Sequence, residues 1–264
     1  MEVSQRIAVS GMLASQRQLE VVSNNLANVG STGFKRAIAH TSDIGYQAEL
    51  NAPVSASASV RVVGIGEGTQ LADIAHDFLP GSVQATGNAL DLALQGDGFF
   101  GVTLADGSTG YTRDGTFNLD ANGQLVTSGG LAIQSTTGGP LNVPADAIDV
   151  QFDDQGQLVA TDATGGQQVI GQVAVSRFAN RAGLQATGQN IWAPTAASGA
   201  ATPAATGTPG APIIVPGAVE GSNVDVSDEM TRMIQAQRGY QLNSKVVQAW
   251  DDIEHMANEL RSGA

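Results

Sequence analysis

Two stretches at opposite ends of the chain carry apolar residues at the spacing of helices that pack on other helices. The intervals of three, four and seven residues are those of a coiled-coil stripe. The N-terminal stripe consists of Val9, Met12, Leu19, Val22, Leu26 and Val29. At the C-terminal end the stripe begins with Val226, Met230, Met233, Tyr240 and Val247. A second series continues it with Val246, Trp250, Ile253, Ala257 and Leu260. Each helix must bury its stripe against something.

The sequence between these stripes contains no matching helical face. We therefore expect the terminal helices to pack on each other, or on the same helices in neighbouring copies. The alternative is that each helix packs on a domain of its own. Asn223 or Asp225 is expected to cap the C-terminal helix, with Asp228 and Glu229 in its first turn. Gly239 inside this helix costs up to ~1 kcal/mol relative to Ala.

The middle of the chain, from about residue 60 to 219, has the pattern of β-strands joined by tight turns. Residues 117–128 predict a hairpin around Asn122-Gly123, as a type I′ turn with positive φ at both positions. The tetrapeptide Gly-Gln-Leu-Val occurs at 123–126 and again at 156–159, each time after an Asp three residues earlier. This repeat predicts a second, similar hairpin. Asp106-Gly107 predicts a third turn.

These patterns predict an α+β fold, with terminal helices that form a coiled-coil-like domain and a central, mostly antiparallel β domain. We place the N-terminal helix at 1–30, an extended connector at 31–70, the β domain at 71–219 and the C-terminal helix at 220–264. Residues 195–212 are rich in Ala, Thr, Gly and Pro and predict a flexible surface loop. Residues 47–60 predict a mobile connection.

Charge and composition exclude several classes of function. The formal net charge is −13, and residues 37–220 hold sixteen acidic but only four basic side chains. Such a surface disfavours nucleic acid and anionic membranes. The absence of cysteine removes thiol catalysis, thiolate metal sites and disulfides. The N-terminus lacks the apolar core of a signal peptide. No segment approaches the roughly 18 apolar residues of a membrane span.

The residues that carry chemistry elsewhere are scattered here. His40, His76 and His255 lack metal-ligand spacing. Asp97 and Asp114 leave open a glycan hydrolase with two carboxylates in one cleft, and the Asp120 segment a calcium loop. Asp beside Gly is far more often part of a turn. We therefore expect no catalytic, cofactor-binding or metal site, and no enzyme.

Four segments resemble the flagellar rod and hook (axial) protein family. SNNLANVGSTGFKR at 23–36 resembles its N-terminal signature, and NALDLALQGDGFFGV at 88–102 its internal block. YTRDGTFNLDANGQLVT at 111–127 resembles the block that follows, and EGSNVDVSDEMTRMIQAQRGYQLNSKVVQ at 220–248 the terminal helix. Within the family, residues 237–245 are most similar to its distal rod members. Proximal rod and short hook-type members are the alternatives. From another class, an extracellular β-domain glycan binder or hydrolase remains.

The resemblance implies a structural subunit of the basal-body rod that assembles into a hollow helical shaft, transmits torque and forms part of the export channel. It implies export by the flagellar type III apparatus without a cleaved signal peptide, and a periplasmic position in the basal body. The partners implied are further copies of the chain, other rod and hook proteins, surrounding ring (bushing) proteins and the export apparatus. No cofactor, nucleic acid or membrane insertion is implied.

Two sets of residues are predicted to serve this role. The expected self-association residues are Met12, Leu19, Val22, Leu26, Met230, Met233, Tyr240, Val247, Trp250, Ile253 and Leu260. The residues that match the family signature are Asn25, Leu26, Ala27, Asn28, Gly33, Phe34 and Lys35.

Overall fold

The computed structural model describes residues 2–48, 64–204 and 212–262. The chain divides into two compact units. Unit 1 comprises Met1–Ala27, Ala37–Ala75 and Asp225–Ala264, and unit 2 comprises Asn28–Arg36 and His76–Val224. Residues 49–60 of the predicted mobile connection lie outside the described residues. Within the described residues, no helix combines the length and the apolar character that crossing a membrane requires.

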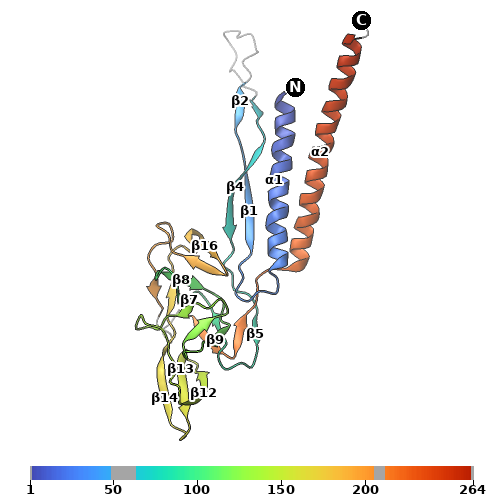
Figure 1. Cartoon of the computed structure of the whole chain (residues 1–264). Coiled ribbons are helices and arrows are strands. Elements are labelled where there is room, and N and C mark those ends of the chain that lie inside the picture. The colour runs from blue at the N-terminus through green and yellow to red at the C-terminus, as the bar shows by residue number, and fades with distance from the viewer. Residues whose placement is uncertain (1, 49–63, 205–211, 263–264) are drawn as a thin grey trace. The chain divides into compact units, whose positions relative to one another are not determined.

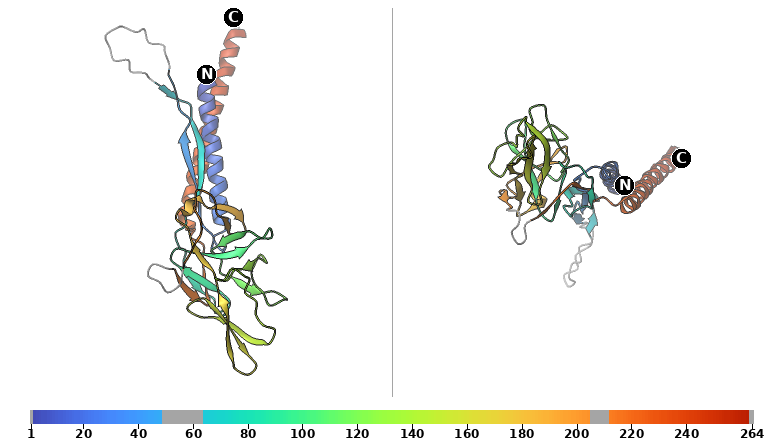
Figure 2. Two further views of the ribbon diagram at one scale, coloured as in Figure 1. Left: turned by 90° about the vertical axis from the view of Figure 1, so that its left-hand side faces the viewer. Right: turned by 90° about the horizontal axis from the view of Figure 1, so that it is seen from below.

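Two long antiparallel helices form most of unit 1. α1 spans Glu2–Ala27 and α2 spans Val226–Ser262, and the two lie side by side (Figures 1 and 2). Asp225 begins α2, because its Oδ1 accepts the backbone N–H groups of Ser227 at 2.8 Å and Asp228 at 3.2 Å. The predicted pairing of the terminal helices is therefore confirmed, and Asp225 is the cap of the two candidates.

A narrow β arm lies along α1 in the same unit. Its strands are β1 (Ala37–Asp43), β2 (Tyr46–Ala48), β3 (Gly64–Gly66) and β4 (Thr69–His76). β1 pairs with β4, and β2 pairs antiparallel with β3. The arm meets α1 closely at Gly68, where a Cβ atom would lie 2.2 Å from Ser10 Oγ. The same hydroxyl accepts the backbone N–H of Thr69 at 3.2 Å.

Unit 2 is built from antiparallel β-sheets, as the sequence predicts. The largest runs in the order β16-β17-β8-β7-β11-β10-β9, and β15 joins β7 to β18. Its strands are β7 (Phe99–Thr103), β8 (Thr109–Thr112), β9 (Phe117–Leu119), β10 (Leu125–Thr127), β11 (Ala132–Ile133), β15 (Val175–Arg177), β16 (Gln185–Gly188), β17 (Ile191–Ala193) and β18 (Thr202–Pro203).

Smaller sheets complete this unit. The three-stranded sheet contains β12 (Ala147–Phe152), β13 (Gln157–Asp162) and β14 (Gln167–Gln172). Two further pairs join β6 (Leu92–Gln95) to β19 (Ile213–Pro216), and β5 (Val83–Ala85) to β20 (Ala218–Glu220). A short 3₁₀ turn spans Arg181–Gly183.

Two apolar clusters fill the interior of unit 2. The larger one is built around fully buried Leu92, Phe100, Phe117 and Leu158. The smaller one is aromatic, with Phe78, Phe99, Tyr111, Phe178 and Trp192 in edge-to-face contact. Because the chain is poor in aromatics, these few rings define where its core lies.

The hairpin predicted at 117–128 is present, but its turn is of another kind. β9 and β10 pair antiparallel with Leu125 opposite Leu119. Only Gly123 has positive φ, at 75°, so the type I′ assignment for Asn122-Gly123 is wrong. The turn is held by Asp120 instead. Its Oδ1 accepts the N–H groups of Asn122 at 2.8 Å and Gln124 at 2.7 Å.

The repeated tetrapeptide does mark a second hairpin of the same design. Asp153 Oδ1 accepts the N–H groups of Gln155 at 2.9 Å and Gln157 at 2.7 Å, and Gly156 has φ 73°. The Asp106-Gly107 turn joins β7 to β8, as predicted. Positive φ at successive positions occurs elsewhere, at Gly188 (102°), Gln189 (52°) and Asn190 (58°), where β16 turns into β17.

Residues 195–204 are not a simple linker. Thr202 and Pro203 pair with β15, and the fully buried Ser198 receives the N–H of Thr195 on its hydroxyl at 2.9 Å. Residues 205–211 lie outside the described residues, and for them the loop remains a prediction.

Candidate functional site: a buried ionic junction

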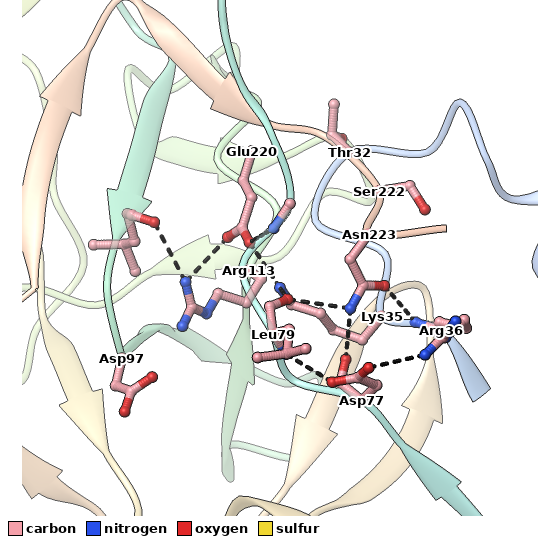
Figure 3. A network of polar contacts seen from close by, with 12 residues as sticks. Thr32, Lys35, Arg36, Asp77, Leu79, Asp97, Arg113, Glu220, Ser222 and Asn223 are labelled. Atoms are coloured by element: carbon pink, nitrogen blue, oxygen red, sulfur yellow. Dashed lines mark hydrogen bonds and ion pairs between the residues drawn. The ribbon is translucent and has the colours of Figure 1, made fainter. Parts of the chain in front are cut away.

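Three charged side chains meet in the interior of unit 2. Glu220, the last residue of β20, has a side chain with no solvent exposure. Its Oε1 accepts Lys35 Nζ at 2.7 Å, and its Oε2 accepts Arg113 Nη1 at 3.0 Å (Figure 3). Both basic side chains are equally buried. We call Lys35, Arg113 and Glu220 the ionic junction. It joins segments that lie 185 and 107 positions apart in the chain.

The backbone around the junction supplies further hydrogen bonds. Gly81 N–H donates to Glu220 Oε1 at 2.9 Å, and Lys35 Nζ also donates to Leu79 O at 2.9 Å. Gly33 N–H donates to the backbone oxygen of Glu220 at 2.7 Å. Gly33 has φ 67°, and a Cβ there would lie 2.5 Å from the carbonyl carbon of Arg113. Position 33 thus requires glycine for its conformation and for its space.

Arg113 is held on every side that its guanidinium offers except one. Nη2 donates to Gly96 O at 2.7 Å, and Nη1 also approaches Leu94 O at 3.4 Å. The guanidinium carbon lies 5.2 Å from the centre of the Phe99 ring, a cation–π distance. Nε alone is buried without a hydrogen-bond partner. This dense set of contacts fixes the side chain in one position.

The electrostatics indicate a structural cluster rather than an acid–base site. Burial lowers the pKa of Lys35, and attraction to Glu220 opposes that shift without reversing it. Burial likewise lowers the pKa of Arg113, again against Glu220. A buried pair of cations shared by one carboxylate needs all three members, because losing one leaves a charge uncompensated. Among the described residues, no cluster of His, Asp and Glu is arranged to hold a metal ion.

A second polar set lies beside the junction in the same unit. Asn223, the other candidate cap, accepts the N–H of Arg36 on Oδ1 at 2.8 Å. Its Nδ2 donates to Asp77 O at 2.8 Å and to Leu79 O at 3.1 Å. Arg36 Nη2 also pairs with Asp77 Oδ2 at 3.1 Å. Asn223 therefore ties two strands of backbone together instead of starting a helix.

In unit 1 a buried amide performs a similar task. Asn25, near the end of α1, is 1% exposed. It donates to Ala37 O at 2.8 Å and accepts Ala37 N–H at 2.9 Å, which fixes the first residue of β1. Its Nδ2 also lies 3.3 Å from Glu229 Oε2 on α2. One side chain thereby links both helices and the β arm.

Comparison with known proteins assigns these segments. Three family profiles match: "Flagella basal body rod protein" at 6–35, "Flagellar hook protein FlgE/F/G D1 domain" at 93–160 and "Flagellar basal body rod FlgEFG protein C-terminal" at 215–260. "Flagellar basal-body rod protein FlgG" of Caulobacter vibrioides is 38% identical, with 97% of this chain and 98% of the relative covered.

The chain belongs to the family of flagellar basal-body rod proteins.

Other relatives agree. The protein of the same name from Bacillus subtilis is 38% identical over 93% of this chain and 94% of its own length. "Flagellar hook protein FlgE" of Escherichia coli is 33% identical over 69% of this chain, and the match covers 46% of the hook protein. The chain thus matches the FlgG rod proteins along nearly their whole length and the hook protein along less than half of its length.

The rod-family signature predicted from the sequence divides between the two units. Asn25 and Lys35 carry the hydrogen bonds described above, and Gly33 supplies the close backbone approach. Asn28 O accepts Ser31 N–H at 3.1 Å in the turn after α1. Of the other signature residues, Leu26 and Phe34 are half-buried apolar side chains and Ala27 is exposed.

The sequence did not identify Glu220 and Arg113 as members of a junction with Lys35. Both lie inside segments that resemble the family, EGSN and YTRDG, but nothing local marks them as a pair.

The contact of α1 with α2 was also incompletely predicted. It contains Gly11, where a Cβ would lie 2.6 Å from Asn243 Nδ2, and Gly239, where a Cβ would lie 3.0 Å from Ser15 Oγ. Gly239 is thus a packing position and not only a cost to the helix.

The predicted self-association residues fall into two groups. One group is buried or half-buried within the subunit: Met12, Leu19, Val22, Leu26, Met233, Val247 and Trp250. The other group is exposed: Met230, Tyr240, Ile253 and Leu260. Assembly contacts stay a prediction for both groups, and the exposed group offers the apolar surface that a neighbour would cover.

Proposed function

We propose that this rod-family chain is a structural subunit that polymerises into a hollow helical shaft and transmits torque to the hook. The observation that carries the proposal is the exposure of large apolar side chains on α2, although that helix already pairs with α1. Met230, Ile234, Leu242, Val246 and Ile253 are each between 44% and 64% exposed. Isolated exposed apolar residues are ordinary, but a helix lined with them requires a partner.

The proposed position and partners are those that the resemblance to this family implies. We propose a periplasmic location in the basal body, reached through the flagellar export apparatus without a cleaved signal, and a place in the export channel. Other rod and hook proteins and the surrounding ring proteins are the proposed neighbours. The ionic junction supports this role, because a shaft under torque requires subunits whose β unit does not rearrange. A catalytic role has no support from the buried charges, which are already paired with one another.

Electron microscopy of the purified protein over a concentration series tests the proposal. The full chain should form tubes above a critical concentration. A variant that ends at residue 224 lacks α2; it should remain dispersed while unit 2, followed through buried Trp192, still unfolds cooperatively. Glu254→Gln, an exposed change that alters no apolar contact, is the control and should assemble like the parent. Failure of the parent to form any ordered polymer at high concentration would contradict the shaft.

A further inference from the structure

α2 carries two stripes at coiled-coil spacing, and they lie on different sides of the helix. The first faces α1 and contains Glu229, Met233, Ala236, Asn243, Val247 and Trp250, all of them buried or half-buried. The second consists of Leu242, Val246, Ala249, Ile253, Met256 and Leu260. Its intervals are four, three, four, three and four residues, an unbroken a/d pattern. We call this second set the open stripe.

Every member of the open stripe is exposed in the subunit. The exposed fraction is 64% at Leu242, 44% at Val246 and 78% at Leu260. From Leu242 to Leu260 the stripe is about 27 Å long at 1.5 Å per residue. Within the described part of the chain, residues 251–261 are all exposed, so no other element packs on this end of α2. A helical end of three turns without tertiary contacts is only marginally stable in water. The partner that packs on it and stabilises it must therefore come from another molecule.

α1 presents a surface of matching character on the side that faces neither α2 nor the β arm. Val9 and Leu13 lie one turn apart on this side and are 43% and 57% exposed. Arg6 and Arg17 border them, and both are exposed. Arg17 pairs with Glu20 of the same helix at 2.7 Å, a surface contact that holds the side chain only weakly. We call Arg6, Val9, Leu13 and Arg17 the outer face of α1.

The charges beside the two surfaces are opposite. Asp252 and Glu259 lie seven residues apart, on one edge of the open stripe. With the helices antiparallel and Leu13 beside Ile253, Arg6 comes close to Glu259 and Arg17 comes close to Asp252. Lys245 lies on the same edge, seven residues before Asp252, so an antiparallel pairing of two open stripes would bring a lysine near Glu259. That pairing would leave Arg6 and Arg17 outside the contact, so the response to substitution of these arginines distinguishes the two arrangements. Complementary edge charges of this type select partner and orientation in coiled coils.

We propose that the open stripe of one copy docks on the outer face of α1 in a second copy, with the acidic edge against the arginines. The inference rests on the proposed self-assembly and names its contact. The two surfaces are different, so the interface is heterologous: each copy offers one surface at each side. A heterologous contact whose rotation does not close a ring builds an open helical polymer.

Charge reversal tests the contact with four proteins, each assayed by light scattering for its critical concentration at low salt. The acidic-edge variant carries Asp252→Lys and Glu259→Lys, and the basic-edge variant carries Arg6→Glu and Arg17→Glu. Each alone should raise the critical concentration by about tenfold or more, because like charges then meet across the interface. A combined variant with all four changes should return to within about threefold of the parent. Asp251→Lys with Glu254→Lys is the matched control, since it reverses two adjacent charges away from that edge, and should stay within about threefold of the parent.

Mixing gives a second test, because it uses only the two single-edge variants and does not require the variant with four changes to fold. Equal amounts of the acidic-edge and basic-edge variants should co-assemble. The acidic-edge variant carries cations on both surfaces and the basic-edge variant carries carboxylates on both, so every contact between unlike copies brings opposite charges together. The melting of unit 2 should be unchanged in all variants. If the parent polymerises and the variants polymerise as readily, the docking is refuted while the rod assembly stands. If the single-edge variants lose assembly and neither combination nor mixing restores it, the pairing of these edges is wrong. If the parent itself forms no polymer, the proposed function fails.

Discussion

Neutralising Glu220 tests whether the ionic junction holds unit 2 together. Glu220→Gln keeps the shape of the side chain and leaves Lys35 and Arg113 buried without a counterion. Removing one partner of a buried ion pair typically costs about 3–5 kcal/mol. Unit 2 belongs to the size class of roughly 150–250 residues, in which 1 kcal/mol shifts the melting temperature by about 2–4 °C. We therefore expect its melting temperature to fall by roughly 6–20 °C.

Tryptophan fluorescence measures this loss in unit 2 alone. The chain has two tryptophans. Trp192 is buried in the aromatic cluster of unit 2, and Trp250 lies on α2. In a Trp250→Phe background the signal therefore reports unit 2. Adding Lys35→Met to Glu220→Gln removes one orphaned cation and should recover about half of the loss or more.

The matched control is a surface ion pair. Arg181 pairs with Asp97, and both side chains are substantially exposed. Arg181→Gln should cost less than about 1 kcal/mol. A melting temperature of Glu220→Gln within about 2 °C of the parent would correspond to a loss of about 1 kcal/mol or less. Buried charge pairing would then not be what stabilises this unit. If the double variant is no more stable than Glu220→Gln alone, the loss comes from the hydrogen bond to Gly81 or from packing.

Four further outcomes are expected. The loss of melting temperature in Glu220→Gln should shrink as pH rises from 7 toward 10. Without the carboxylate the pKa of Lys35 falls further below its unfolded value, so the native state binds fewer protons than the unfolded state and stability rises with pH. A difference in melting temperature from the parent that stays constant over this pH range would contradict this. Gly33→Ala should lower the melting temperature of unit 2 by at least several degrees, because φ is positive and the backbone leaves no room; an unchanged melt speaks against that packing. Gly239→Leu should speed amide hydrogen exchange in α1 without affecting unit 2, and equal exchange would mean that the helices tolerate the side chain. Hydrogen bonds in its turn lower the pKa of Asp162, so Asp162→Asn should destabilise at pH 7, with a difference that vanishes as pH falls through that lowered pKa; a difference constant with pH would exclude the carboxylate as its source.

The sequence was most informative where structure depends on local pattern. The terminal helices follow from apolar periodicity, and the hairpins follow from Asp and Gly at fixed spacing, because a turn is specified by a few adjacent residues. The turn chemistry at Asn122-Gly123 was nevertheless wrong, because the carboxylate of Asp120 stabilises a different loop. Asp120 was visible in the repeated pattern, but the turn type was assigned from the Asn-Gly dipeptide alone, which carries no information on the hydrogen bonds of that carboxylate.

The ionic junction escaped prediction for a different reason. Lys35 was recognised only as part of a signature, since its carboxylate partner Glu220 lies 185 positions away and has no periodic relation to it. The same holds for the glycines on the helix contact. Gly239 reduces helix propensity when taken by itself, and only the neighbouring helix explains why a small residue suits that place. Long-range polar and steric complementarity therefore had to come from the structure.

Unit 1 is assembled from three separate pieces of the chain, and this arrangement sets an order of events during synthesis. The ribosome releases α1 and the β arm early, whereas α2 emerges only after residues 76–224, as the bond between Asn25 and Glu229 spans 204 positions. Residues 76–224, by contrast, are contiguous and emerge before α2. A nascent chain can thus begin to form its β unit while α1 still lacks its partner helix. The open stripe emerges after both α1 and the β unit, so a chain that stops before it exposes α1 but lacks the surface with which we expect it to join a neighbour.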